Sequence, residues 1–70
     1  MERKKVMSSN INSIGFDKES QILEIEFTQG NIYQYTGVSE QVFMNLIDAS
    51  SHGKYFHAFV KDKYPTKRVR

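Results

Sequence analysis

The chain contains no cysteine and only one proline among its 70 residues. Without thiols it can form neither a disulfide nor a thiolate metal site that would compensate for a small hydrophobic core. No apolar run approaches the roughly 20 residues that cross a bilayer, and no apolar segment of a signal peptide follows the charged residues near the N-terminus. These absences predict a protein of the cytoplasm that is not inserted into a membrane.

The short length limits what the fold can enclose. A domain of this size buries only about 60% of the surface of its unfolded chain, which leaves little interior for a deep active site. The composition, 39% hydrophobic and 26% charged, is typical of a folded domain. We therefore expect one domain over residues 9–64, a flexible basic N-terminus over residues 1–8, and a mobile basic C-terminal tail over residues 65–70.

The net charge of +2 conceals an uneven distribution. Residues 1–5 carry +2, with three bases against Glu2. Residues 6–53 carry −5, with one base against six acids, and residues 54–70 carry +5, with six bases against Asp62. Basic charge therefore gathers at the two ends of the chain.

The first half of the chain predicts an antiparallel sheet. Residues 10–16 combine β-branched and aromatic side chains and end in turn-forming residues, which is typical of a strand. Residues 22–27 alternate between an acidic face, Glu24 and Glu26, which should meet water, and an apolar face of Leu23, Ile25 and Phe27. Residues 32–35 alternate again. We expect a three-stranded antiparallel meander.

The loop before the third strand decides where Tyr33 and Tyr35 lie, because opposed residues in an antiparallel pair share a face. A three-residue loop, 28–30, pairs the tyrosines with the apolar face and directs both into the core. A two-residue loop, 29–30, would place them beside the two glutamates on the exposed face. We favour the longer loop, since a type I turn followed by a left-handed glycine is a common hairpin closure.

The second half predicts two helices on one face of the sheet, which makes the fold class α+β. Ser39 can cap an amphipathic helix over residues 39–50. After a break at residues 50–53, aromatic side chains at helical spacing indicate a short second helix that Pro65 ends. The predicted core is Ile14, Phe16, Leu23, Ile25, Phe27, Tyr33, Tyr35, Val42, Phe43, Leu46, Ile47, Phe56, Phe59 and Val60.

Several short motifs together resemble a known family over residues 9–64. They are Ser8-Ser-Asn-Ile11, Ile14-Gly-Phe16, Leu23-Glu-Ile-Glu-Phe27, Tyr33-Gln-Tyr35, Gly37-Val38 and Ser51-His-Gly-Lys-Tyr-Phe56. In this order they resemble the KTSC domain, which is named after the C-terminal domain of some lysyl-tRNA synthetases. The resemblance implies a domain that occurs both fused to a synthetase and free-standing in bacteria and their phages. The fusion suggests RNA binding.

Basic and aromatic residues near the C-terminus are candidates for contact with nucleic acid. Lysine and arginine neutralise phosphates, and interleaved tyrosines can stack on bases. The candidates are Lys54, Tyr55, Lys61, Lys63, Lys67 and Arg68, and Tyr33 and Tyr35 are possible stacking residues if they are not core residues. The sequence thus predicts a binding module for RNA or other nucleic acid.

The chain shows no catalytic or metal-binding pattern. His52 and His57 are five residues apart, which does not put two imidazoles on one helix face, and no further ligand stands at metal spacing. We expect Glu24 and Glu26 to form the solvent-exposed face of a strand and not a catalytic pair of carboxylates. We therefore expect no enzyme, no cofactor and no metal.

A protein-interaction or homo-oligomerising module is the alternative. The partner would bind a sheet edge or an exposed face of the sheet formed by Glu24, Glu26, Ile32 and Gln34. An unprotected edge could also pair two copies of the chain.

Overall fold

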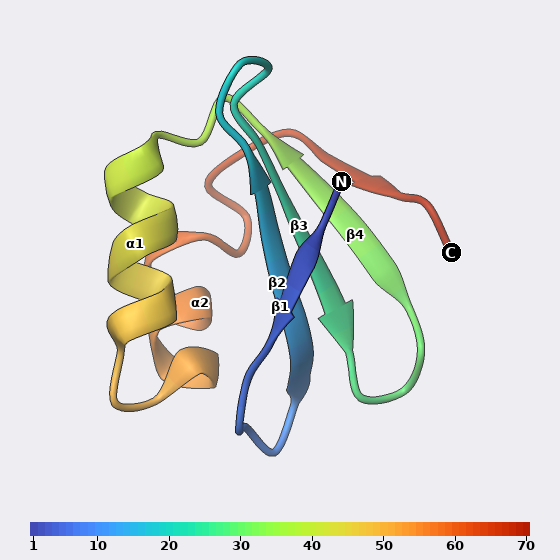
Figure 1. Cartoon of the computed structure of the whole chain (residues 1–70), viewed down its shortest axis with the longest axis vertical. Coiled ribbons are helices and arrows are strands. Elements are labelled where there is room, and N and C mark those ends of the chain that lie inside the picture. The colour runs from blue at the N-terminus through green and yellow to red at the C-terminus, as the bar shows by residue number, and fades with distance from the viewer.

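The computed structural model describes all 70 residues and shows an antiparallel sheet with both helices on one of its faces (Figure 1). The sheet has five strands in the order β1-β2-β3-β4-β5. The elements are β1 (Arg3–Lys5), β2 (Ile11–Asp17), β3 (Ile22–Phe27), β4 (Ile32–Thr36), α1 (Glu40–Asp48), α2 (His52–Phe59) and β5 (Thr66–Arg68). The α+β meander is confirmed, and one strand is added at each edge.

The added strands come from the two ends that the sequence predicts to be flexible. In β1, Arg3 pairs with Gly15 of β2, and in β5, Thr66 pairs with Tyr35 of β4. Residues 3–5 and 66–68, which the sequence predicts to be flexible, thus form edge strands of the sheet. Strands of three polar residues give no alternating pattern, and they form because β2 and β4 otherwise expose unpaired backbone groups.

Gly15 lets β1 approach the sheet. A Cβ atom at Gly15 would lie 2.6 Å from the backbone oxygen of Glu2 and 2.9 Å from Cγ of Arg3. No other residue type has the space for this contact, so glycine is required here by packing.

The β3–β4 hairpin has the three-residue loop that the sequence favours. The Phe27 amide donates to the Asn31 carbonyl over 2.9 Å, and Gly30 adopts a left-handed backbone with φ of +100°. Ile25 consequently pairs with Tyr33, and Leu23 pairs with Tyr35. Both tyrosines lie on the helix-covered face, as predicted.

Serine hydroxyls begin both helices. Ser39 Oγ accepts from the Val42 amide over 3.3 Å and caps α1, as predicted. Ser51 Oγ accepts from the Lys54 amide over 3.3 Å, so α2 starts before the residues at which the sequence places it. The glycine that suggested a break, Gly53, lies inside the first turn of α2.

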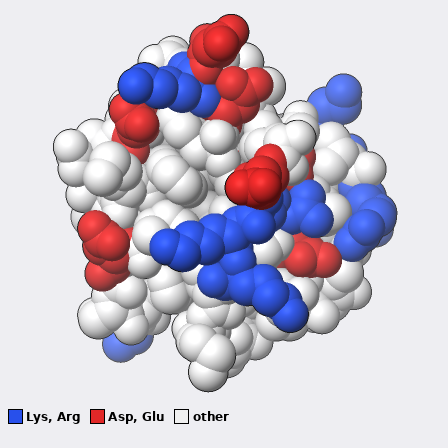
Figure 2. Space-filling view, in the orientation of Figure 1, with Lys and Arg blue, Asp and Glu red and all other residues white.

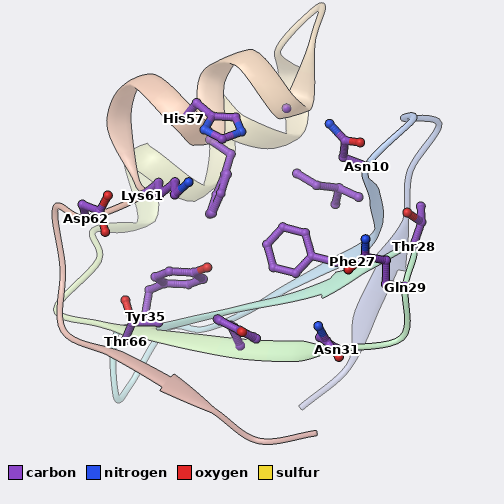
Figure 3. Close-up of a pocket in the computed structure, with 14 residues that line it drawn as sticks. Asn10, Phe27, Thr28, Gln29, Asn31, Tyr35, His57, Lys61, Asp62 and Thr66 are labelled. Atoms are coloured by element: carbon purple, nitrogen blue, oxygen red, sulfur yellow. The ribbon is translucent and has the colours of Figure 1, made fainter.

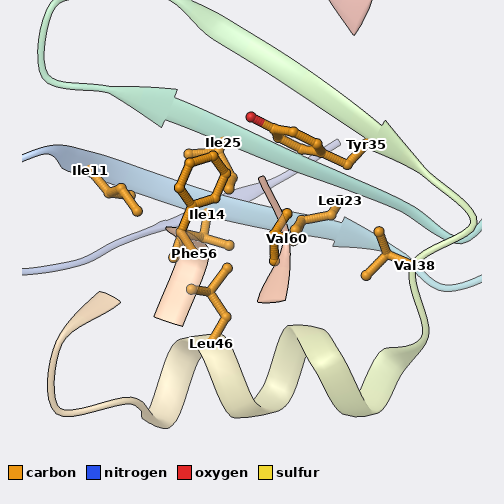
Figure 4. Close-up of a cluster of buried hydrophobic side chains, with 9 residues drawn as sticks. All are labelled: Ile11, Ile14, Leu23, Ile25, Tyr35, Val38, Leu46, Phe56 and Val60. Carbon is orange, nitrogen blue, oxygen red and sulfur yellow. The ribbon is translucent and has the colours of Figure 1, made fainter. Parts of the chain in front are cut away.

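The core lies between the sheet and the helices (Figure 4). Phe59 was predicted to be buried, but it is 56% exposed and packs on Tyr55 with ring centroids 4.7 Å apart. Ile11 and Val38 are buried although the sequence did not indicate them. The buried cluster is Ile11, Ile14, Leu23, Ile25, Tyr35, Val38, Leu46, Phe56 and Val60.

The opposite face of the sheet is less open than its alternating acidic residues predict. Glu24 is only 6% exposed and Ile32 only 5%. The Arg3 guanidinium of β1 pairs with the Glu24 carboxylate, which also accepts from Gln34 Nε2 over 2.8 Å. The predicted exposed interaction face is therefore wrong for Glu24 and Ile32, because the terminal strands add side chains that cover it.

Candidate binding pocket

A pocket of about 570 Å³ opens on the helix-covered face of the sheet, between α2 and β4 (Figure 3). This volume lies within the range of small-molecule sites in proteins, about 300–1,000 Å³. The walls come from the β1–β2 loop, the β3–β4 hairpin, α2 with its following turn, and β5. Segments far apart in sequence therefore build it together.

The floor of the pocket is aromatic. Phe27 packs edge-to-face against Tyr33, with centroids 5.8 Å apart, and against Phe56, with centroids 5.4 Å apart. Tyr35 makes the same kind of contact with Phe56, with centroids 5.7 Å apart. These edge-to-face contacts fix the rings, so the floor presents a preformed apolar surface.

The two tyrosines of the floor differ in what they expose. Tyr35 is 3% exposed, and Figure 3 shows its hydroxyl pointing into the pocket. Burial raises the pKa of Tyr35 well above the ordinary value, so the hydroxyl stays neutral and can donate a hydrogen bond. Tyr33 is half-buried and offers part of its ring to the pocket.

The rim of the pocket is polar. Figure 3 shows Lys61, Asp62 and Thr66 at one end and Asn10 and Thr28 at the other. Side-chain amides both donate and accept hydrogen bonds, so they suit a ligand whose edge carries both kinds of group. The rim side chains are Asn10, Thr28, Gln29, Asn31, His57, Lys61, Asp62 and Thr66.

Some of the basic residues predicted to bind nucleic acid lie at this pocket. Lys61 lines it. Arg68 pairs with Tyr33 across β4 and β5, and its Nη2 donates to Oδ1 of Asn31 over 3.1 Å. Since Arg68 and the pocket-lining Thr66 are two residues apart on β5, they share one face of the strand. Arg68 is not itself a lining residue, but its bond to the lining Asn31 places it next to the pocket.

The other predicted residues lie elsewhere. Lys67 points from β5 to the opposite face of the sheet, where it pairs with Gln34. Lys63 is exposed and does not line this pocket. Tyr55 packs on Phe59, and Lys54 lines a second pocket near the start of α2. The structure thus divides the six predicted residues among several surfaces.

The face that carries β1 mixes charges of both signs. Figure 2 shows basic side chains beside acidic ones on this face. Arg3 pairs with Glu24, and Arg70 Nη2 lies 3.1 Å from Oε2 of Glu26. Because these acids are paired, the basic ends do not form a continuous positive surface.

Of the rim residues the sequence indicates only Lys61, and the uncharged polar residues of the rim and Asp62 are not indicated. Asn10, Gln29 and Asn31 lie in or beside turns, where such residues are common for backbone reasons alone. His57 carries no pattern in the sequence that indicates a binding role. No local signal separates these residues from ordinary loop residues, since the pocket exists only after the hairpin and α2 meet.

The histidines lie apart from any acidic cluster. His52 Nε2 is 3.2 Å from the Ile47 carbonyl oxygen, while His57 lines the pocket. Nowhere in the structure do three histidine, aspartate or glutamate side chains gather in a metal-binding arrangement. Neither helix has the length and apolar character needed to cross a membrane.

One family of known proteins resembles this chain over most of its length. The profile of the KTSC domain matches residues 7–64. The crystal structure of a KTSC domain protein from Yersinia pestis superposes with a TM-score of 0.94 at 40% sequence identity, covering 99% of this chain and 97% of that one. An uncharacterised protein of Stutzerimonas stutzeri is 39% identical over 64 residues, which are 91% of this chain and 90% of that protein.

The same similarity extends to part of a larger enzyme. A lysine–tRNA ligase of Nostoc punctiforme is 35% identical over 65 residues. These residues make up 93% of this chain but only 12% of the ligase. The chain is therefore similar to a small segment of that enzyme.

Proposed function

This chain belongs to the KTSC domain family, and we propose that it is a small non-enzymatic module that binds single-stranded RNA. The observation that carries the proposal is the pocket between α2 and β4. It combines an aromatic floor, a rim rich in amides, and the Lys61 ammonium group in its lining, and the Arg68 guanidinium lies beside it, bonded to the lining residue Asn31. Single-stranded RNA offers the three matching chemistries, which are a flat base, polar base edges and phosphates.

An unstacked base enters the pocket and lies against the exposed part of the Tyr33 ring. Contact between a base and an aromatic side chain contributes about 1–3 kcal/mol. The side chains of Gln29 and Asn31, and the Tyr35 hydroxyl, stand where a base edge can form hydrogen bonds. The pocket therefore recognises a base by contacts that a stacked, paired base cannot make.

Lys61 and Arg68 bind the phosphates of the RNA backbone next to that base. Lys61 and Arg68 are exposed, so each can bind a phosphate without losing a buried ion pair. Asp62 lies beside Lys61 on the rim and opposes an anion there, which limits the number of phosphates at this end. Affinity should accordingly be moderate and dependent on salt.

RNA is preferred to DNA in this proposal for two reasons. A relative that shares this domain over a small segment is a lysine–tRNA ligase, whose name identifies tRNA as its substrate. The rim also carries hydroxyl and amide groups that can bond to a ribose 2′-hydroxyl, which DNA lacks.

Fluorescence anisotropy with labelled single-stranded RNA oligonucleotides of mixed sequence tests the proposal. Arg68→Gln and Lys61→Gln should each weaken binding about three- to tenfold and make the slope of log affinity against log salt shallower by about 0.7. Lys67→Gln is the matched control, because Lys67 neighbours Arg68 but points to the opposite face of the sheet. Equal effects of Arg68→Gln and Lys67→Gln would exclude the pocket as the binding surface.

Purification without nuclease separates RNA binding from the alternative of a protein-interaction module. Co-purified nucleic acid, seen in the ratio of absorbance at two wavelengths, supports the proposal. The proposal is contradicted if the protein purifies free of nucleic acid and binds no oligonucleotide at low salt. Elution as a dimer would then favour self-association.

A further inference from the structure

A second pocket, of about 650 Å³, lies directly beside the first. The two pockets share three lining residues, Asn10, Gly53 and His57, so they adjoin at these residues.

The chemistry of the second pocket differs from that of the first. Its lining contains no aspartate or glutamate, and it includes the Lys54 ammonium group, two imidazoles and several hydroxyls. The first pocket instead carries the Asp62 carboxylate at the end farthest from Asn10 (Figure 3). Near Asp62 the carboxylate opposes the attraction of Lys61 for an anion, whereas no carboxylate opposes Lys54 at the other end.

Part of the polar lining is already occupied. Ser8 Oγ accepts from the amides of Asn10 and Ile11, and Ser51 Oγ accepts from the Lys54 amide. His52 Nε2 faces the Ile47 carbonyl. The polar lining side chains that make no such bond are those of Ser9, Asn10, Ser50, Lys54 and His57.

Gly53 stands at the junction of the two pockets. Because it has no side chain, the backbone is bare where one pocket meets the other. A Cβ atom there would meet Asn10 Nδ2 at 3.7 Å, an ordinary van der Waals contact. A methyl group therefore fits the fold at this position but narrows the junction.

We propose that the second pocket holds a phosphate of the RNA whose base occupies the first pocket. The RNA backbone then passes over the protein backbone at Gly53. The inference rests on the proposed function and deepens it. Lys54 neutralises the phosphate, and the hydroxyls of Ser9 and Ser50 and the ring of His57 are available as hydrogen-bond donors. The ligand of the double site is thus a base together with the phosphate on one side of it, and Lys61 and Arg68 meet the backbone on the other side.

Lys54→Gln tests the phosphate site, with Lys63→Gln as the matched control because Lys63 is exposed and lines neither pocket. Binding is measured with a tetranucleotide and with the four free nucleosides. Lys54→Gln should weaken tetranucleotide binding about three- to tenfold and make the salt slope shallower by about 0.7, while nucleoside binding stays unchanged. Lys63→Gln should behave as the wild type.

Gly53→Ala is a second, uncharged test of the same site. It should weaken tetranucleotide binding severalfold and leave nucleoside binding and the melting temperature largely unchanged. If the tetranucleotide binds the wild type, Lys54→Gln and Lys63→Gln alike, with one salt slope, the phosphate site is wrong and the base pocket stands. If the wild type binds neither nucleoside nor tetranucleotide, the proposed function and the phosphate site are both wrong.

Discussion

Arg3 and Glu24, on strands β1 and β3, form an ion pair across the intervening strand β2. The contact passes over Gly15, the β2 residue that pairs with both of them. The Arg3 Nε also donates to Ser13 Oγ over 3.0 Å. Through these contacts Arg3 stabilises the packing of the edge strand β1 on β2 and β3.

Arg3→Ala should destabilise the fold because it leaves the Glu24 carboxylate, 6% exposed, without its cation. Losing one partner of a buried charged hydrogen bond costs about 1.5–3 kcal/mol, and the bond from Gln34 that remains limits the loss. Urea unfolding measures the change. Lys5→Ala on the same strand is the control, with an effect within about 0.5 kcal/mol. Similar losses in both variants would mean that the ion pair contributes nothing.

Gly15→Ala should detach β1. Its Cβ would meet the Glu2 backbone oxygen at 2.6 Å, so the strand must move away. We expect a loss of about 1–3 kcal/mol, together with faster hydrogen exchange of the amides that β1 and β2 share. Because Gly15→Ala and Arg3→Ala both release β1, their effects in the double variant should be less than additive. Strict additivity would show that the two residues act separately.

The stability of the protein should fall on acidification. Burial raises the pKa of Glu24, but hydrogen bonds from Gln34 and Arg3 outweigh it and hold that pKa below the ordinary value of 4.5. A hydrogen bond from Ser13 lowers the pKa of Glu26 in the same way. A carboxyl with a lowered pKa in the folded state contributes stability above its unfolded pKa and loses it as the pH falls through the folded value.

Unfolding by urea at several values of pH measures this dependence. The free energy of unfolding should be level near neutral pH and decline below about pH 4.5. Glu24→Gln should reduce the slope of the decline, because glutamine does not titrate. A decline of equal slope in the variant would rule out a contribution from Glu24.

Phe56 and Phe59 should respond differently to truncation although they lie in the same helix. Phe56 is 6% exposed and contacts Phe27 and Tyr35, so Phe56→Ala should cost about 3–5 kcal/mol. Phe59 is 56% exposed, so Phe59→Ala should cost about 1 kcal/mol or less. Thermal unfolding of the two variants makes the comparison. A larger loss for Phe59 would contradict the orientation of α2.

The central fold could be predicted from local patterns. Strict alternation in residues 22–27 indicated β3, and Gly30 indicated the loop whose register directs Tyr33 and Tyr35 to the helices. Ser39 marked the start of α1. These signals are local because backbone conformation and side-chain periodicity depend on neighbouring residues. The second helix was found, but its start was misplaced because Gly53 resembled a break.

The candidate site could be predicted only in part. Lys61, Arg68 and the two tyrosines were named from the sequence, but nothing in it separated them from Lys63, Lys67 and Tyr55. Lys67 and Arg68 point to opposite faces of the sheet because successive side chains alternate along a strand. This alternation exists only when residues 66–68 pair with β4. The side-chain amides of the rim could not be predicted, because in the sequence they look like ordinary turn residues. They line a pocket only when the β3–β4 hairpin packs near α2.

The sequence by itself determined that the chain is a small α+β domain without thiols, with an acidic centre and basic ends, because composition and periodicity are properties of the chain alone. The tertiary structure decided where those charges lie. It brought Arg3 to Glu24 and Arg70 to Glu26, and it made the two pockets meet at Gly53. Such contacts join residues distant in sequence, and they form only where strand pairing and helix packing bring them together.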